Sequence, residues 1–165
     1  MIERRLFNIW AGLALAGSGA PVATSSAQQT GGSGRPDAQQ AVAAFVTKYT
    51  DAYNRKDATG VASLYTEDGI VVQPGPMVTG RQNLERYWRA AFDAGRRDLR
   101  YETQQVRAEG NIVWSIGQFT VVGPSPQGGQ IQQNYGVFVN IYQWEGDELR
   151  FRVHSFSLLP GAPSR

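Results

Sequence analysis

The sequence predicts one α+β domain, in which helices pack against one face of a curved, mostly antiparallel sheet. The first observation is the order of patterns, because segments with helical spacing and a short hairpin precede four long segments of strand character. The second is the tight-turn chemistry at residues 109–111 (Glu-Gly-Asn) and 145–147 (Glu-Gly-Asp). Helices followed by a run of antiparallel strands are typical of an α+β fold.

Three helices are expected in the first part of the domain. Asp37 follows Pro36 and begins a long helix that ends near Asn54. Its apolar stripe consists of Val42, Phe45, Val46, Tyr49 and Tyr53. Asp57 is suited to cap a second, short helix, which is expected to contain Val61, Leu64 and Tyr65. Gly80 opens a third helix, whose stripe consists of Leu84, Tyr87, Trp88, Ala91 and Phe92.

The strands are expected to begin between the second and third helices. Residues 67–69 (Glu-Asp-Gly) have the composition of a turn, and a short hairpin follows over residues 70–79, interrupted by Pro-Gly-Pro at residues 74–76. After Gly95 the pattern changes to long strands, expected over residues 99–108, 112–122, 130–144 and 149–158.

Composition excludes several classes of site. The chain has 165 residues, a formal net charge of +2, no cysteine and one histidine. It therefore has no disulfide framework, thiolate metal site or multi-histidine metal site, and its small charge does not predict nucleic-acid binding. There is no phosphate-binding loop or Gly-x-Ser-x-Gly motif, so no cofactor is predicted.

The first residues are typical of an export signal. Residues 1–27 combine a charged start with a short apolar stretch, too short to span a bilayer, and small residues before a cleavage site after Ala27. Arg4 and Arg5, followed by Phe7, allow either an ordinary secretory signal or a twin-arginine signal. We expect an exported, periplasmic or secreted protein without stable membrane insertion. Residues 28–36 form a flexible linker, residues 37–159 the domain and residues 160–165 a tail.

Four segments carry a resemblance to a known superfamily. They are residues 48–70 (from Lys-Tyr-Thr-Asp to Asp-Gly-Ile), 78–88 (Val-Thr-Gly-Arg through Tyr-Trp), 136–144 and 149–156. Their order and spacing resemble nuclear transport factor 2-like proteins, which include ketosteroid isomerases and SnoaL-like cyclases. The resemblance implies a cone-shaped fold, with the sheet wrapped around the long first helix and a pocket at the open end. It also implies pairing through the sheet face, and hence a homodimer.

The resemblance to ketosteroid isomerases assigns positions in that pocket. The tyrosine that binds the oxyanion corresponds to Tyr49, and the late aspartic acid corresponds to Asn140, whose amide can still donate a hydrogen bond. The catalytic base falls at Gln73. An amide is not basic near neutral pH, so this departure argues against abstraction of a proton from carbon.

His154 is the remaining titratable candidate, either as a general acid or base with Tyr49 and Asn140 or as a hydrogen-bonded core histidine. Strand alternation places it on one face with Phe156. The other expected pocket residues are aromatic or polar, and each aromatic has core packing as its alternative reading; they are Tyr53, Gln73, Trp88, Trp114, Phe119, Phe138, Tyr142 and Phe156. The arginines at residues 96 and 97 are expected at solvated or dimer-facing positions.

Two functions remain open from the sequence. One is a pocket protein that binds a small, largely apolar molecule, with or without activity of the isomerase, lyase or hydrolase type. The other is a dimerising or protein-interaction module whose pocket is filled by its own side chains. A cavity lined by hydrogen-bond donors would favour the first, and a sealed interior the second.

Overall fold

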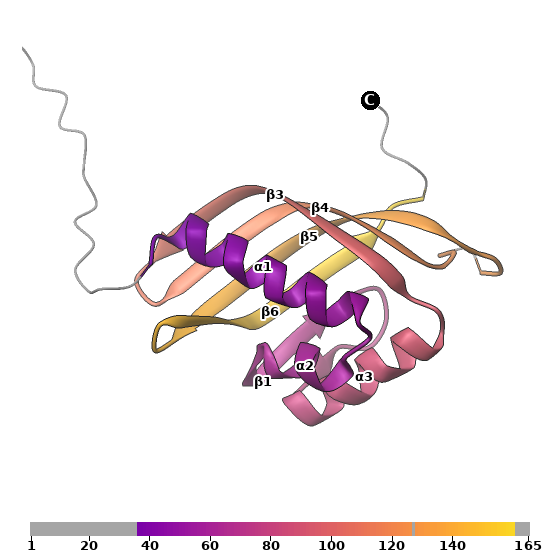
Figure 1. Cartoon of the computed structure of the whole chain (residues 1–165), viewed down its shortest axis with the longest axis horizontal. Coiled ribbons are helices and arrows are strands. Elements are labelled where there is room, and N and C mark those ends of the chain that lie inside the picture. The colour runs from indigo at the N-terminus through magenta and orange to yellow at the C-terminus, as the bar shows by residue number, and fades with distance from the viewer. Residues whose placement is uncertain (1–35, 127, 161–165) are drawn as a thin grey trace, which may run out of the picture. The chain divides into compact units, whose positions relative to one another are not determined.

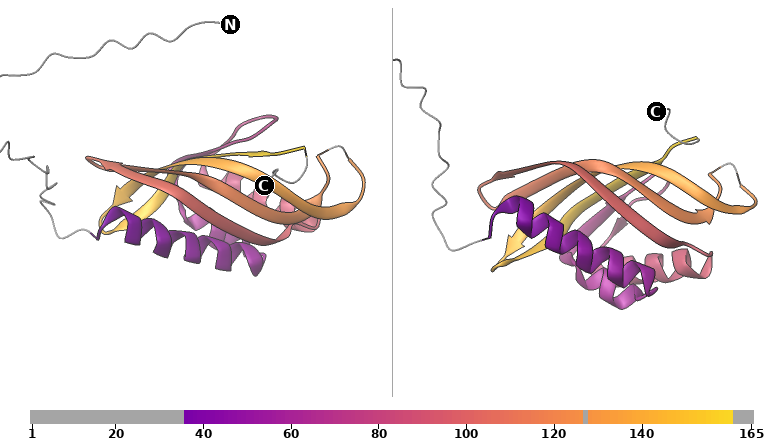
Figure 2. Two further views of the ribbon diagram at one scale, coloured as in Figure 1. Left: turned by 90° about the horizontal axis from the view of Figure 1, so that it is seen from above. Right: turned by 45° about the horizontal axis from the view of Figure 1, so that its top comes forward.

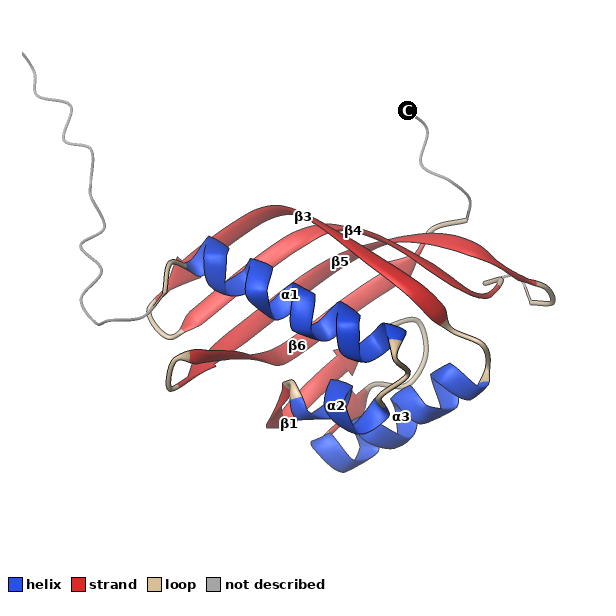
Figure 3. Cartoon of the chain, viewed as in Figure 1, coloured by secondary structure: helices blue, strands red, loops and turns tan. Residues whose placement is uncertain are grey.

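The computed structural model describes residues 36–126 and 128–160 (Figure 1). The expected export signal, most of the linker and most of the tail lie outside the described residues. Six strands form one sheet in the order β2-β1-β6-β5-β4-β3, and three helices accompany them (Figure 3). The predicted α+β fold is confirmed.

The helices are α1 (Ala38–Asn54), α2 (Ala58–Ser63) and α3 (Arg81–Asp93). The Asp37 carboxylate caps α1 by accepting hydrogen bonds from the backbone of Gln39 and Gln40, and Asp57 caps α2 in the same way. The buried stripe of α1 consists of Val42, Phe45, Tyr49, Ala52 and Tyr53. Within the part of the chain that the structure describes, no helix is long and apolar enough to cross a membrane.

The strands are β1 (Tyr65–Val72), β2 (Val78–Thr79), β3 (Arg97–Glu109), β4 (Ile112–Pro124), β5 (Ile131–Glu145) and β6 (Glu148–Leu158). Strands β3 to β6 form an antiparallel meander, and β1 joins β6 in parallel. This parallel pair brings residues from the start and the end of the domain together, because Val71 lies opposite His154.

The sheet has an inner face under the helices and an outer face that none of the three described helices covers (Figure 2). Phe138, Asn140 and Tyr142 lie on one face of β5, as strand alternation predicts, and the structure buries that face together with His154 and Phe156. The outer face carries an apolar group that we call the outer-face patch; it consists of Trp114, Ile116, Val137, Val139, Ile141 and Val153. Val139 is 51% exposed at its centre.

Two local predictions were wrong. Helix α2 ends at Ser63, and Tyr65 begins strand β1 instead of continuing the helix. The reason is a tertiary contact, because the Phe151 amide on β6 donates to the Leu64 carbonyl at 2.9 Å and draws the chain into the sheet. The residues expected as a turn at 67–69 lie inside β1, where the pairing with β6 is irregular between Tyr65 and Ile70.

Candidate functional site

A small cavity lies in the core, between α1, α3 and the inner face of the sheet. Its volume is about 20 Å³, which is enough for one water molecule. Six of the expected site residues line it: Tyr49, Tyr53, Trp88, Phe119, His154 and Phe156. Sequence reasoning missed the other four, which are Arg96, Leu99, Tyr101 and Val121.

His154 is held by two tyrosine hydroxyls. Its Nδ1 lies 2.6 Å from the Tyr65 hydroxyl on β1, and its Nε2 lies 2.9 Å from the Tyr101 hydroxyl on β3. The histidine is only 1% exposed. A neutral imidazole has one N–H donor and one acceptor, so one tyrosine donates to the ring and the other accepts from it.

Aromatic rings fix the orientation of the imidazole. Phe151 stacks on it with a centroid distance of 4.5 Å and an interplanar angle of 6°. Trp88 stacks less closely, at 5.9 Å and 25°, and Tyr49 meets it edge-on at 5.4 Å. Rings in these arrangements attract each other beyond the effect of burial alone. His154 is therefore a rigid part of the wall.

The site is uncharged around His154. Burial lowers the pKa of His154 from 6.5 to about 3, so its imidazole is neutral at pH 7. Burial also raises the pKa of the Tyr49, Tyr65 and Tyr101 hydroxyls well above 10, because an ionised phenolate would be desolvated there. The site consequently offers neutral hydrogen-bond donors and acceptors.

Two unpaired atoms indicate the direction of this hydrogen-bond chain. The Trp88 indole N–H makes no hydrogen bond of good geometry, yet it stands close enough to the Tyr65 hydroxyl to lower that tyrosine's pKa against the effect of burial. At the other end, Asn140 Oδ1 has no donor, while the Asn140 side chain contacts the Tyr101 hydroxyl. Because an indole N–H only donates, we infer that protons point from Trp88 to Tyr65, His154 and Tyr101 in turn.

The polar chain continues behind Tyr101. The Asn140 amide donates to the Tyr142 hydroxyl at 3.3 Å, and that hydroxyl lies 3.0 Å from Ser115 Oγ. All three side chains are buried, and burial raises the pKa of Tyr142 to about 12.

Arg96 marks the side of the cavity nearest to solvent. It is half-buried, whereas most of the other lining residues are fully buried. Burial raises the pKa of Tyr53 and Tyr87, and the charge of Arg96 and its hydrogen bonds to both hydroxyls act in the opposite direction. Tyr87 in turn donates to Gln73 Oε1 at 2.8 Å. We call this group of Gln73, Tyr87, Arg96 and Tyr53 the mouth of the cavity.

Several expected site residues lie elsewhere. Trp114 does not line the cavity, because alternation along β4 places it on the outer face. Asn140, Phe138 and Tyr142 are buried on the inner face but lie behind Tyr101, whose ring stacks on Phe138 at 4.3 Å. Gln73 reaches the mouth through Tyr87 and does not line the cavity itself.

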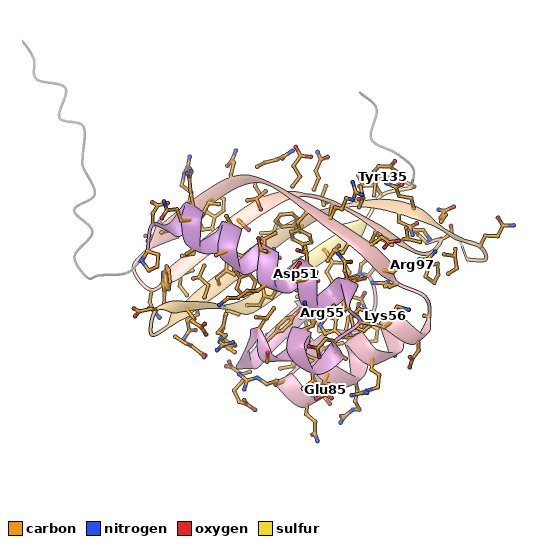
Figure 4. All side chains as sticks on the ribbon, in the orientation of Figure 1. Asp51, Arg55, Lys56, Glu85, Arg97 and Tyr135 are labelled. Atoms are coloured by element: carbon orange, nitrogen blue, oxygen red, sulfur yellow. The ribbon has the colours of Figure 1, made fainter. Side chains whose placement is uncertain are left out.

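Different signals could have found the missed residues. Tyr101 shares its face of β3 with Leu99, so alternation alone places it inward. Tyr65 was hidden by its assignment to a helix. Arg96 was expected in solvent beside Arg97, and only the backbone geometry after α3 turns it inward; Arg97 lies exposed where β3 begins (Figure 4).

The described residues offer no cluster of three or more histidine, cysteine, aspartate or glutamate side chains that would hold a metal ion. The cavity has no carboxylate in its lining. The chemistry available from these side chains is hydrogen bonding, aromatic contact and the single charge of Arg96.

This cone with a helix-covered inner cavity defines the class of the protein. Residues 46–155 match the family of SnoaL-like domains, and the chain belongs to that family. The prediction of a nuclear transport factor 2-like protein is thereby confirmed. A comparison of the sequence with curated proteins finds no match.

Solved structures support the same fold. A ketosteroid isomerase-like protein from Erwinia carotovora atroseptica is 19% identical, with a TM-score of 0.64 over 75% of this chain and 96% of that chain. A putative dehydratase of the NTF2-like family from Streptomyces avermitilis is 15% identical, with a TM-score of 0.61 over 74% and 97%. An NTF2-like protein with a cystatin-like fold from Novosphingobium aromaticivorans is 16% identical, with a TM-score of 0.59 over 76% and 84%.

Proposed function

We propose that the protein binds a small molecule with a flat, unsaturated body inside the cone, and that it performs no acid–base reaction on it. The observation that carries this proposal is the Tyr65–His154–Tyr101 arrangement beside the cavity. Neutral donors held by packed rings are suited to bind a polar group of a ligand without a large cost of reorganisation.

The absence of a suitable base supports binding over catalysis. Ketosteroid isomerase and dehydratase are the names of similar structures, and both reactions move protons. In this chain the expected base position is occupied by Gln73, which is engaged with Tyr87, and the cavity lining contains no carboxylate. With a pKa of about 3, His154 is a weak base, so proton abstraction from carbon near pH 7 would be slow.

A second candidate is an interaction module with a filled interior. The volume of about 20 Å³ favours it, because a ring-sized ligand enters only if wall side chains move. The outer-face patch supplies a surface for such a role, with Val137 41% exposed and Val139 51% exposed.

We also propose that two copies pair through this patch, since both copies would then bury it.

Native mass spectrometry separates the two candidates. Protein purified from its own source is measured intact and then after denaturing extraction. Under the binding proposal a small molecule is released, and it is lost from His154→Phe, whose imidazole contacts are removed. Trp114→Phe on the outer face is the matched control and should retain it. An empty protein that also takes up nothing from a metabolite extract would favour the interaction module.

We propose further that the protein is exported. The support is the signal-like composition of residues 1–27 and a chain without cysteine, which tolerates an oxidising compartment. Mass measurement of protein recovered from the periplasm or medium tests this, because removal after Ala27 gives one defined mature mass. Recovery only from the cytoplasm, at the full mass, would contradict it.

A further inference from the structure

The backbone after α3 is shaped to aim Arg96 at the cavity. Gly95 has φ +95° and Asp98 has φ +55°, both in the left-handed region. The pairing of β3 with β4 shifts register between Arg97 and Arg100, which is the mark of a bulge. Arg96 lies just before this irregular start of β3 and directly after Gly95. It lines the cavity, whereas the next residue, Arg97, is exposed.

Neighbouring contacts hold this segment in place. A Cβ atom added to Gly123 on β4 would lie 3.0 Å from Arg96 Cγ, so the arginine stem crosses the space that this glycine leaves open. The Asn54 side chain at the end of α1 binds the backbone of Leu99 on both sides, with Leu99 N–H donating at 2.8 Å and Leu99 O accepting at 3.1 Å. The backbone that carries Arg96 is therefore held from α1, and the arginine stem runs along β4, while the guanidinium beyond the stem remains half-buried.

Arg96 has a charge without a counter-ion. The other half-buried arginines of the described chain all form ion pairs with carboxylates; they are Arg81, Arg150 and Arg152. Arg96 forms none within the residues that the structure describes, and its contacts at the mouth are the neutral hydroxyls of Tyr53 and Tyr87. A guanidinium presents a planar fork of donors that matches a carboxylate far better than it matches two phenols.

The Tyr53 hydroxyl supplies a second donor. Tyr87 gives its proton to Gln73, so its oxygen only accepts from Arg96. The Arg96 guanidinium lies close enough to the Tyr53 hydroxyl to act on its pKa against the effect of burial. A hydroxyl that accepts from a guanidinium keeps its own proton to donate. An acceptor placed at the mouth would therefore be bound by Arg96 and Tyr53 together, while Tyr87 stays with Gln73.

We propose that the ligand carries a carboxylate on an unsaturated ring, that Arg96 and Tyr53 bind the carboxylate at the mouth, and that the ring lies among the cavity's aromatic walls. This rests on the proposed binding function. The cavity of about 20 Å³ has to widen for the ring. Of the side chains that line the cavity, Arg96 can move most easily. It is half-buried, and its movement breaks contacts only with the neutral hydroxyls of Tyr53 and Tyr87. Burial of the ring and pairing of the carboxylate stabilise the widened state.

Fluorine NMR with two probes of nearly equal shape tests the inference. The probes are para-fluorobenzoate and its neutral amide, para-fluorobenzamide, added to purified protein near pH 7. We expect the benzoate to bind more tightly, and Arg96→Gln to weaken it about tenfold or more. Arg97→Gln is the matched control, because it removes the same charge from the adjacent exposed residue; it should change the benzoate affinity less than about twofold. Tyr53→Phe should weaken the benzoate as well.

Each other outcome has a distinct meaning. If the benzamide binds as well as the benzoate, and Arg96→Gln weakens both or neither, the carboxylate inference is wrong and the binding function stands. If Arg96→Gln and Arg97→Gln lose equal benzoate affinity, the loss comes from the lower net positive charge and not from a direct contact. That result would also overturn the inference. If neither probe binds to the unaltered protein, the carboxylate inference is overturned, and native mass spectrometry of the purified protein decides separately whether the binding function stands. Melting temperatures of the variants establish that each is folded.

Discussion

The Tyr65 hydroxyl lies 2.6 Å from Nδ1 of His154, although the two residues are 89 positions apart in the chain. The contact exists because β1 runs parallel to β6, with Val71 opposite His154. It joins the first strand of the domain to the last at the wall of the cavity. The stability, the protonation and the ligand preferences of the site all depend on this junction.

The protein should lose stability in mild acid through His154. The sign follows from its pKa, which is about 3 in the folded protein and 6.5 when unfolded. Between these values the unfolded chain binds the extra proton, so folding is favoured fully above pH 6.5 and progressively less as pH falls. We expect the free energy of unfolding to drop by about 2 kcal/mol between roughly pH 7.5 and pH 5.

Urea unfolding at several pH values measures this dependence. His154 is the only histidine in the chain, so the effect has a single source above the range of the carboxylates. His154→Phe should be less stable at pH 7 but nearly independent of pH over the same interval. A pH dependence that persists in this variant would contradict the assignment.

The imidazole should carry its proton on Nε2. The Trp88 indole N–H stands near the Tyr65 hydroxyl without a hydrogen bond of good geometry. From this we infer that Tyr65 donates to Nδ1 and that the Nε2 proton points to Tyr101. Nitrogen-15 NMR distinguishes the two tautomers directly. Trp88→Phe removes the donor that sets the direction and should give a mixture of tautomers. A proton found on Nδ1 of the unaltered protein would reverse the inferred direction of the chain.

Asn140→Asp should introduce a carboxyl group whose pKa is raised close to neutral pH. Asn140 is fully buried, and the described residues around it offer hydroxyls but no cation. Burial would raise the carboxyl pKa by about 3, which costs roughly 4 kcal/mol of stability at pH 7. Because the folded variant then binds the extra proton, its deficit relative to the unaltered protein should shrink as pH falls. Gln104→Glu, which makes the same change from amide to carboxylate at an exposed residue, is the control.

Val139→Glu should prevent pairing through the outer-face patch. The side chain is 51% exposed in the single chain, and a carboxylate at the centre of a buried interface would be desolvated without a partner. Sedimentation velocity should show a dimer for the unaltered protein and a monomer for the variant. Gln143→Glu adds the same charge at the rim of this face and should leave the dimer intact. A monomeric unaltered protein at micromolar concentration would refute the pairing.

The helices and long strands could be predicted because their signals are local. Asp37 and Asp57 cap helices by bonds to their immediate neighbours, and the hairpin glycines at 110 and 146 adopt φ +59° and +64°. Strand alternation alone predicted that His154 and Phe156 share one face of their strand, and the structure buries that face. These features depend on residues a few positions apart, which the sequence displays directly.

The remaining features depend on partners that are distant in sequence. Tyr65 follows a helical pattern and joins the sheet only because β6 pairs with it. A tryptophan is usually more buried than a serine, but here Ser115 is fully buried and Trp114 only half-buried. Ser115 faces inward because its hydroxyl has a buried partner in Tyr142, and Trp114 belongs to the outer-face patch. Arg96 lies between Gly95 and Asp98, whose positive φ angles set the path of the backbone, and the sequence does not show toward which side that path turns Arg96.

The single histidine also allows the transient opening of the domain to be measured. His154 is 1% exposed and both of its ring nitrogens are occupied by tyrosines, so an acylating reagent such as diethyl pyrocarbonate reaches it only while the cone is open. The rate of modification at this one position therefore counts opening events. A ligand bound beside the imidazole would lower the rate of His154 modification. The size of this decrease would report the fraction of protein with ligand bound, even when the ligand is unidentified.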